Sequence, residues 1–133
     1  MINTNEVFTR VRDALKTEFG ESTYVVGDFV ATPSKFPCVS VIEIGNTPLL
    51  RYMDMSATDE QARSTFEIQA YSNLTSGGTT QTKKLIECAT GEFKKMGYRV
   101  TINSPLENAD KSIKRHVARV TRVIGGGDTL PTI

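Results

Sequence analysis

The apolar residues of this chain follow two different periods, and this pattern constrains the fold more than any other feature of the sequence. Between residues 7 and 19 they recur at spacings of one, three and four, which places them on one face of a helix. They are Val7, Phe8, Val11, Leu15 and Phe19. Asn3 and Glu6 have the spacing of an N-terminal capping box, and Gly20 suits the left-handed conformation that ends many helices. We therefore expect a first helix that ends at Gly20.

A second helical pattern starts between Ser76 and Thr80 and ends at Gly97. Its apolar face consists of Leu85, Ile86, Ala89, Phe93 and Met96. Gly91 lies inside this pattern, where a glycine costs about 1 kcal/mol relative to alanine. We therefore expect a neighbouring segment to approach the helix closely at Gly91.

The other regular stretches alternate with a period of two, which is typical of strands. They span residues 24–31, 38–44, 65–71, 98–103 and 111–124. Residues 45–64 are less regular, and residues 104–110 have the composition of a turn. The element order α-β-β-β-α-β-β predicts an α+β fold, a mainly antiparallel sheet with two helices packed on one face. We assign residues 1–124 to a single domain and residues 125–133, which begin with three glycines, to a flexible C-terminal tail.

Two helices on one face leave the other face of the sheet to solvent or to a partner. In residues 65–71, alternation places Phe66, Ile68 and Ala70 on the buried side. The side chains that we assign to the opposite face are Glu43, Glu67, Gln69, Arg99 and Thr101. That face is therefore expected to be polar.

The composition indicates an ordinary soluble domain and excludes several classes of protein. The chain has 133 residues and a net charge of +1, unlike the strongly basic chains that bind nucleic acid through global charge. Its apolar runs are far shorter than the roughly 20 residues that span a bilayer, and MINTNEVF does not resemble a signal peptide. Cys38 and Cys88 are expected to be unpaired, small buried side chains.

No pattern of residues predicts catalysis. His116 is the single histidine, and with two distant cysteines it supplies no metal-site spacing. No GxSxG nucleophile motif is present, and Gly77-Gly78 lacks the GK[ST] ending of a phosphate-binding loop. We therefore predict a protein that is not an enzyme, with no catalytic, metal-binding or cofactor-binding residues.

Residues 111–124, KSIKRHVARVTRVI, hold five Lys and Arg residues and no Asp or Glu. Three interpretations remain open: an edge strand protected from unwanted pairing, a subunit boundary where arginines meet carboxylates, and a nucleic-acid surface. Alternation places Lys111, Arg115 and Arg119 on one side, with no aromatic residue for stacking on bases. Arg115 and Arg119 are therefore candidates for an assembly interface.

Residues 48–55, PLLRYMDM, are apolar but lie outside the regular alternation. An apolar arm often marks a contact site, although a hairpin tip that folds back on its own sheet would have the same composition. The additional interface candidates are Leu49, Leu50, Arg51, Tyr52 and Met53.

The order of these features resembles the tail terminator (tail completion) proteins of long-tailed bacteriophages. The resemblance covers roughly residues 3–124. The stretches that carry it are VFTRVRDALKTEF, FPCVSVIEI, TFEIQAYS, LIECATGEFKKMGYRV and PLENADKSIKRHVARVTRVI. Related neck and head–tail connector proteins look similar.

The resemblance implies a structural virion protein, assembled in the host cytoplasm, that forms a ring, usually a hexamer, on the head-proximal end of the tail tube. Such a ring ends tube polymerisation and offers a surface for joining the head. The implied partners are other copies of the chain, the tail tube protein and the head–tail connector protein. DNA would only pass through the lumen, and no membrane is involved. The alternatives are another neck component or, from the basic strand, a small nucleic-acid-binding α/β module.

Overall fold

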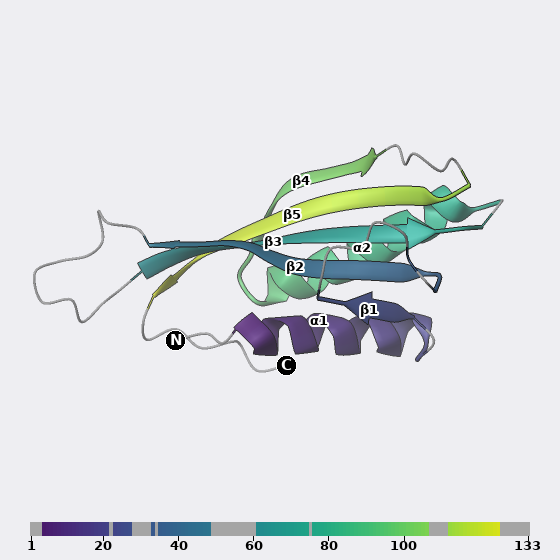
Figure 1. Ribbon diagram of the computed structural model, residues 1–133. Coiled ribbons are helices and arrows are strands. Elements are labelled where there is room, and N and C mark those ends of the chain that lie inside the picture. Colours follow the sequence, from purple (N-terminus) through teal and green to yellow (C-terminus); the bar gives the residue numbers. More distant parts are fainter. Residues whose placement is uncertain are drawn as a thin grey trace, which may run out of the picture.

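The computed structural model describes residues 4–21, 23–27, 33, 35–48, 61–74, 76–106 and 112–125 (Figure 1). Their elements follow in the order α1 (Thr4–Phe19), β1 (Tyr24–Val26), β2 (Cys38–Pro48), β3 (Gln61–Ser72), α2 (Gly78–Lys95), β4 (Arg99–Leu106) and β5 (Lys114–Gly125). This is the predicted order. Asn3 and most of the predicted tail, residues 126–133, lie outside the described residues, so the cap and the domain limits remain predictions.

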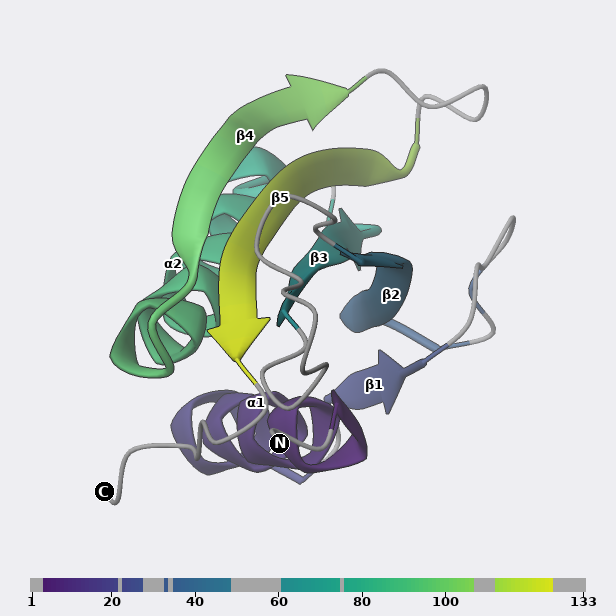
Figure 2. The ribbon, with the colours of Figure 1, turned by 90° about the vertical axis from the view of Figure 1, so that its left-hand side faces the viewer.

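The strands form one sheet with the order β1-β2-β3-β5-β4. Only β1 and β2 pair in parallel, and the other neighbours are antiparallel. The β3–β5 ladder is continuous from Gln61–Gly125 to Ser72–Lys114, so it forms the centre of the sheet. Both helices lie on one side of the sheet, and β4 and β5 bend strongly along their length (Figure 2). The predicted α+β architecture is confirmed.

The core lies between the helices and the sheet. Val7, Val11 and Leu15 of α1 are fully buried, as are the five residues predicted for the apolar face of α2. The rings of Phe66, Phe93 and Tyr98 pack with centroids 5.1–5.8 Å apart, mostly edge to face. The hydroxyl groups of Tyr98 and Ser64 lie 2.9 Å apart, so the polar end of this aromatic cluster is also satisfied.

Glycines end both helices, as predicted. Gly20 and Gly97 have φ values of 101° and 88°, which side-chain-bearing residues rarely adopt. The Tyr98 N–H donates to the Phe93 carbonyl, which closes the end of α2. The expectation for Gly91 is wrong, because a Cβ placed there would meet nothing within 4 Å.

The strands depart from the predicted limits in three places. β2 continues to Pro48, and β3 already begins at Gln61. A register shift between Glu43 and Gly45 interrupts the alternation, so the sequence pattern did not predict this extension. β4 runs through Pro105, where a turn was expected; an edge strand tolerates proline because one side of it needs no ladder partner. β1 ends at Val26, and residues 28–31 of its predicted range lie outside the described residues.

The two cysteines are free, and they lie on different sides of the sheet. Cys38 is fully buried in a small cluster with Tyr71 and Ile113 on the side away from the helices. Cys88 is half-buried on α2. The prediction of unpaired thiols is confirmed, although only Cys38 is fully buried.

Candidate interaction face of the sheet

The side chains that point away from both helices form what we call the open face. Cross-strand partners share a face, so the register of β3, β4 and β5 assigns its members. Its charged residues are Arg63, Glu67, Arg99, Arg115 and Arg119. The assignment of Glu43 to this face is wrong, because Glu43 pairs with Phe66 and therefore lies on the helix side. Among the described residues the open face thus carries four arginines and one carboxylate.

A chain of hydrogen bonds runs along β3 on this face. The Tyr71 hydroxyl donates to Gln69 Oε1 at 2.7 Å, and Gln69 Nε2 donates to Glu67 Oε1 at 2.5 Å. Arg119 Nε completes the chain by donating to Glu67 Oε2 at 2.9 Å. Glu67 and Gln69 lie on the predicted face but are only 8% exposed, so little of either residue is open to solvent or to a partner. Hydrogen bonds to each other, to Tyr71 and to Arg119 satisfy their polar groups.

Arg115 and Arg119 share the open face of β5, as alternation predicted, but their surroundings differ. Arg119 is neutralised by Glu67. The Arg115 guanidinium lies over the Tyr71 ring, 6.0 Å from its centroid, and its buried Nε has no hydrogen-bond partner within the described chain. Burial raises the pKa of Tyr71, and the Arg115 charge opposes that shift. Of the two arginines, Arg115 has no carboxylate partner among the described residues.

Exposed apolar side chains lie among these arginines. A register shift between Val100 and Ile102 leaves Thr101 as an extra residue, so Val100 stays opposite the core residue Val120 while Ile102 pairs with Arg119. Ile102, Leu106 and Val123 are 40–42% exposed. Arginine interspersed with exposed apolar groups is typical of protein interfaces. An uninterrupted period of two over residues 98–103 would instead place Ile102 on the side of Tyr98 and Val100.

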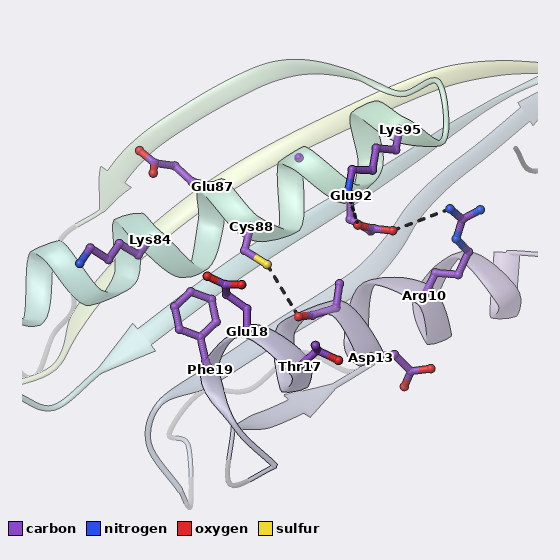
Figure 3. Close-up of a pocket in the computed structure, with 12 residues that line it drawn as sticks. Arg10, Asp13, Thr17, Glu18, Phe19, Lys84, Glu87, Cys88, Glu92 and Lys95 are labelled. Carbon is purple, nitrogen blue, oxygen red and sulfur yellow. Dashed lines mark hydrogen bonds and ion pairs between the residues drawn. The ribbon is translucent and has the colours of Figure 1, made fainter. Parts of the chain in front are cut away.

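A groove of about 970 Å³ separates α1 from α2 on the other side of the molecule (Figure 3). Glu92 lies between two cations, with Arg10 Nη2 at 3.7 Å and Lys95 Nζ at 3.6 Å. Cys88 points to the Ala14 carbonyl at 3.9 Å, and burial raises its pKa, aided by Glu18. A thiol with a raised pKa is a poor nucleophile at neutral pH.

His116 lies on the helix side of β5 and is 7% exposed. Its Nε2 lies 2.5 Å from Asn103 Oδ1. Burial lowers the pKa of the imidazole, and the nearby Lys83 charge lowers it further. Among the described residues, no group of three or more His, Cys, Asp or Glu side chains could hold a metal ion. In the same part of the chain no helix is long and apolar enough to cross a membrane.

The structure therefore places two of the seven predicted interface residues, Arg115 and Arg119, on one face. The others, residues 49–53, lie outside the described residues. Sequence reasoning missed Tyr71 and the role of Glu67, because their contacts depend on the register between β3 and β5. The alternation of residues 67, 69 and 71 was the available signal, since it places all three on one side of a strand.

The fold has similar solved structures, whereas no protein-family model and no curated protein matches the sequence. A chain in the virion of a native gene transfer agent particle is similar over 90% of this chain and 92% of that one, with a TM-score of 0.58 and 16% identity. A second similar chain belongs to the sheath/tube terminator of an extracellular contractile injection system (PVC) in the extended state. It has a TM-score of 0.48 and 11% identity, and the match covers 100% of this chain but only 62% of the terminator.

At these identities the likeness shows a shared fold. Along nearly its whole length, the chain shares its fold with a chain of the gene transfer agent virion. The expected α+β fold is thus shared with a chain of a virion.

Proposed function

We propose that this protein is a structural virion component that caps the head-proximal end of a phage tail tube as a ring. The observation that carries the proposal is the fold shared with a chain of a gene transfer agent virion, over 90% and 92% of the two chains. The ring ends tube polymerisation by burying the growing end, and it offers the head connector a new surface. DNA crosses its lumen without sequence-specific contacts. The role needs no enzymatic activity.

The two sides of the molecule support an assembly role. The open face combines arginines with exposed apolar side chains, and the helix side has a groove with charges of both signs. Two different faces on one chain permit head-to-tail contacts, which close into a ring when the rotation between neighbours divides a full turn. We expect six subunits, assembled in the host cytoplasm.

The same fold also suits a neighbouring neck or head–tail connector component. A nucleic-acid-binding module is a further alternative, favoured by the four arginines of the open face. Against it, Arg119 is already paired with Glu67, and exposed apolar groups lie between the charges.

A phage that lacks the gene tests the proposal. Electron microscopy of the lysate should show tails of irregular, extended length that do not join heads, and a plasmid copy of the gene should restore normal particles. Tails of normal length that fail to join heads would favour the connector alternative. Tails of normal length on complete particles would contradict both.

The purified protein gives a second measurement. Size-exclusion chromatography with light scattering should detect a species of about six times the 14.6 kDa subunit, at high concentration or in the presence of tube protein. A nucleic-acid-binding module would instead retain DNA with an affinity that falls steeply with salt.

A further inference from the structure

We propose that the open face of one copy binds residues 49–60 of the neighbouring copy, with Arg115 as the main hydrogen-bond donor to a carboxylate of that segment. The inference rests on the ring proposed above and names the contact that would hold it together. Four observations carry it: the charges, the exposed apolar residues, the lack of a carboxylate partner for Arg115 among the described residues, and the reach of the chain.

The charges of the two partners are complementary. Among the described residues, the open face carries four arginines and a single carboxylate, which already accepts from Arg119. Residues 49–60, LLRYMDMSATDE, contain Asp54, Asp59 and Glu60 against one cation, Arg51. Opposite charges across an interface favour the correct partner and orientation, even where their net energy is small.

The apolar residues are complementary as well. Ile102, Leu106 and Val123 leave about two-fifths of their surface uncovered on the open face. Residues 49–60 supply Leu49, Leu50, Tyr52, Met53 and Met55. A nucleic acid would leave these apolar groups without matching contacts. An apolar, acidic protein segment therefore fits this face better than a phosphate backbone.

Arg115 is the arginine best placed to accept the new partner. Arg119 is held by Glu67 at 2.9 Å, whereas Arg115 forms no ion pair with a carboxylate in the described part of the chain. Tyr71 holds the Arg115 guanidinium from one side. A guanidinium fixed in this way binds a carboxylate with little loss of side-chain freedom.

Chain length indicates that the segment which meets Arg115 comes from another copy. Residues 49–60 connect β2 and β3 at the end where Pro48 pairs with Ala62. Arg115 pairs with Tyr71, nine residues further along β3, and this corresponds to about 30 Å at strand geometry. A loop of twelve residues whose two ends are anchored on adjacent strands extends at most about 20 Å from those ends, because half of its residues lead out and half lead back. The segment therefore cannot reach Arg115 of its own chain.

A charge-swap experiment on the full chain tests the inference by light scattering. Arg115→Glu should raise the concentration for half-assembly at least tenfold, and so should the triple reversal Asp54→Lys, Asp59→Lys and Glu60→Lys. The four changes combined in one chain should restore assembly to within about threefold of the wild type. The milder Arg115→Gln should weaken assembly less than Arg115→Glu, and circular dichroism should show that each variant is folded.

The control segment consists of Glu107 and Asp110, the acids nearest to Arg115 along the chain. Reversing both to Lys should leave assembly unchanged and should not rescue Arg115→Glu. Rescue by this pair, or folded combined variants that stay dissociated, would overturn the inference. So would an Arg115→Glu variant that assembles normally but no longer retains DNA.

The outcomes for this contact and for the proposed function are separable. An Arg115→Glu variant that forms rings and complements the deletion phage overturns this contact and leaves the tail role intact. A deletion phage with normal tails joined to heads overturns the tail role, whatever the light scattering shows.

Discussion

Arg119 Nε lies 2.9 Å from Glu67 Oε2, and this ion pair joins two adjacent strands on a face without a helix. Glu67 is almost fully buried, and it also accepts a hydrogen bond from Gln69. The pair thus compensates a carboxylate that would otherwise be desolvated without a countercharge.

Replacing Arg119 with alanine should therefore lower the free energy of unfolding by about 1–3 kcal/mol, because a buried carboxylate loses its charged donor. Urea unfolding measures the loss. The double variant Arg119→Ala/Glu67→Gln should be less destabilised than the sum of its single variants. Additive losses would show that the two side chains do not interact in solution.

The two glycines at positions 91 and 97 should respond to alanine in opposite directions. Gly97 has a φ of 88°, and a Cβ there would lie 3.2 Å from the Arg122 guanidinium. Gly97→Ala should therefore destabilise the fold by about 1–2 kcal/mol. Gly91 is helical, and a Cβ there would meet nothing within 4 Å, so Gly91→Ala should stabilise by up to about 1 kcal/mol. Thermal unfolding measures the melting temperature of each variant. Changes of the same sign in the two variants would contradict this prediction.

Stability should depend on pH through His116. Its pKa is lowered in the folded protein by burial and by Lys83, so the unfolded chain binds the proton more readily. The stability contributed by the neutral imidazole is complete above the ordinary pKa of about 6.5 and is lost as the pH falls below it. His116→Gln should therefore show a shallower decline in unfolding free energy between pH 7.5 and pH 5. Equal slopes for the two proteins would assign the decline to other groups.

The thiols should differ in their rates of alkylation. Burial raises the pKa of Cys38 to about 11 and leaves no exposed surface, so Cys38 should react only after unfolding. Cys88 is half-buried, and its pKa is also raised, so it should react slowly in the native protein. Mass spectrometry after iodoacetamide treatment at pH 8 measures both. In a Cys88→Ser variant only Cys38 remains. Alkylation of that variant while it is folded would contradict the predicted order of reactivity.

The elements of the fold follow from local sequence signals. The apolar spacing of Val7, Val11 and Leu15 and the glycine at position 20 defined α1, because a helix face and its end depend on residues close in the chain. Strand limits were less predictable. The register shift beside Gly45 interrupts the period of two, so the continuation of β2 to Pro48 has no signature in the residues themselves.

On the open face, too, the sequence predicted the positions of residues but not their contacts. Alternation on β5 was sufficient to place Arg115 and Arg119 together. It did not reveal that one is neutralised by Glu67 and the other lies over Tyr71, because these partners are 52 and 44 positions away in the sequence. Cross-strand register decides them, and only the folded sheet contains that information.

The extra residue Thr101 divides β4 into two halves with different constraints. A substitution before it, at Val100, changes how the domain holds together, whereas substitutions after it, at Ile102 or Leu106, change mainly what the molecule presents to its surroundings. Evolution can therefore remodel positions 102 and 106 to suit a new neighbour at little cost to the interior. An engineer who wishes to alter specificity has the same freedom there.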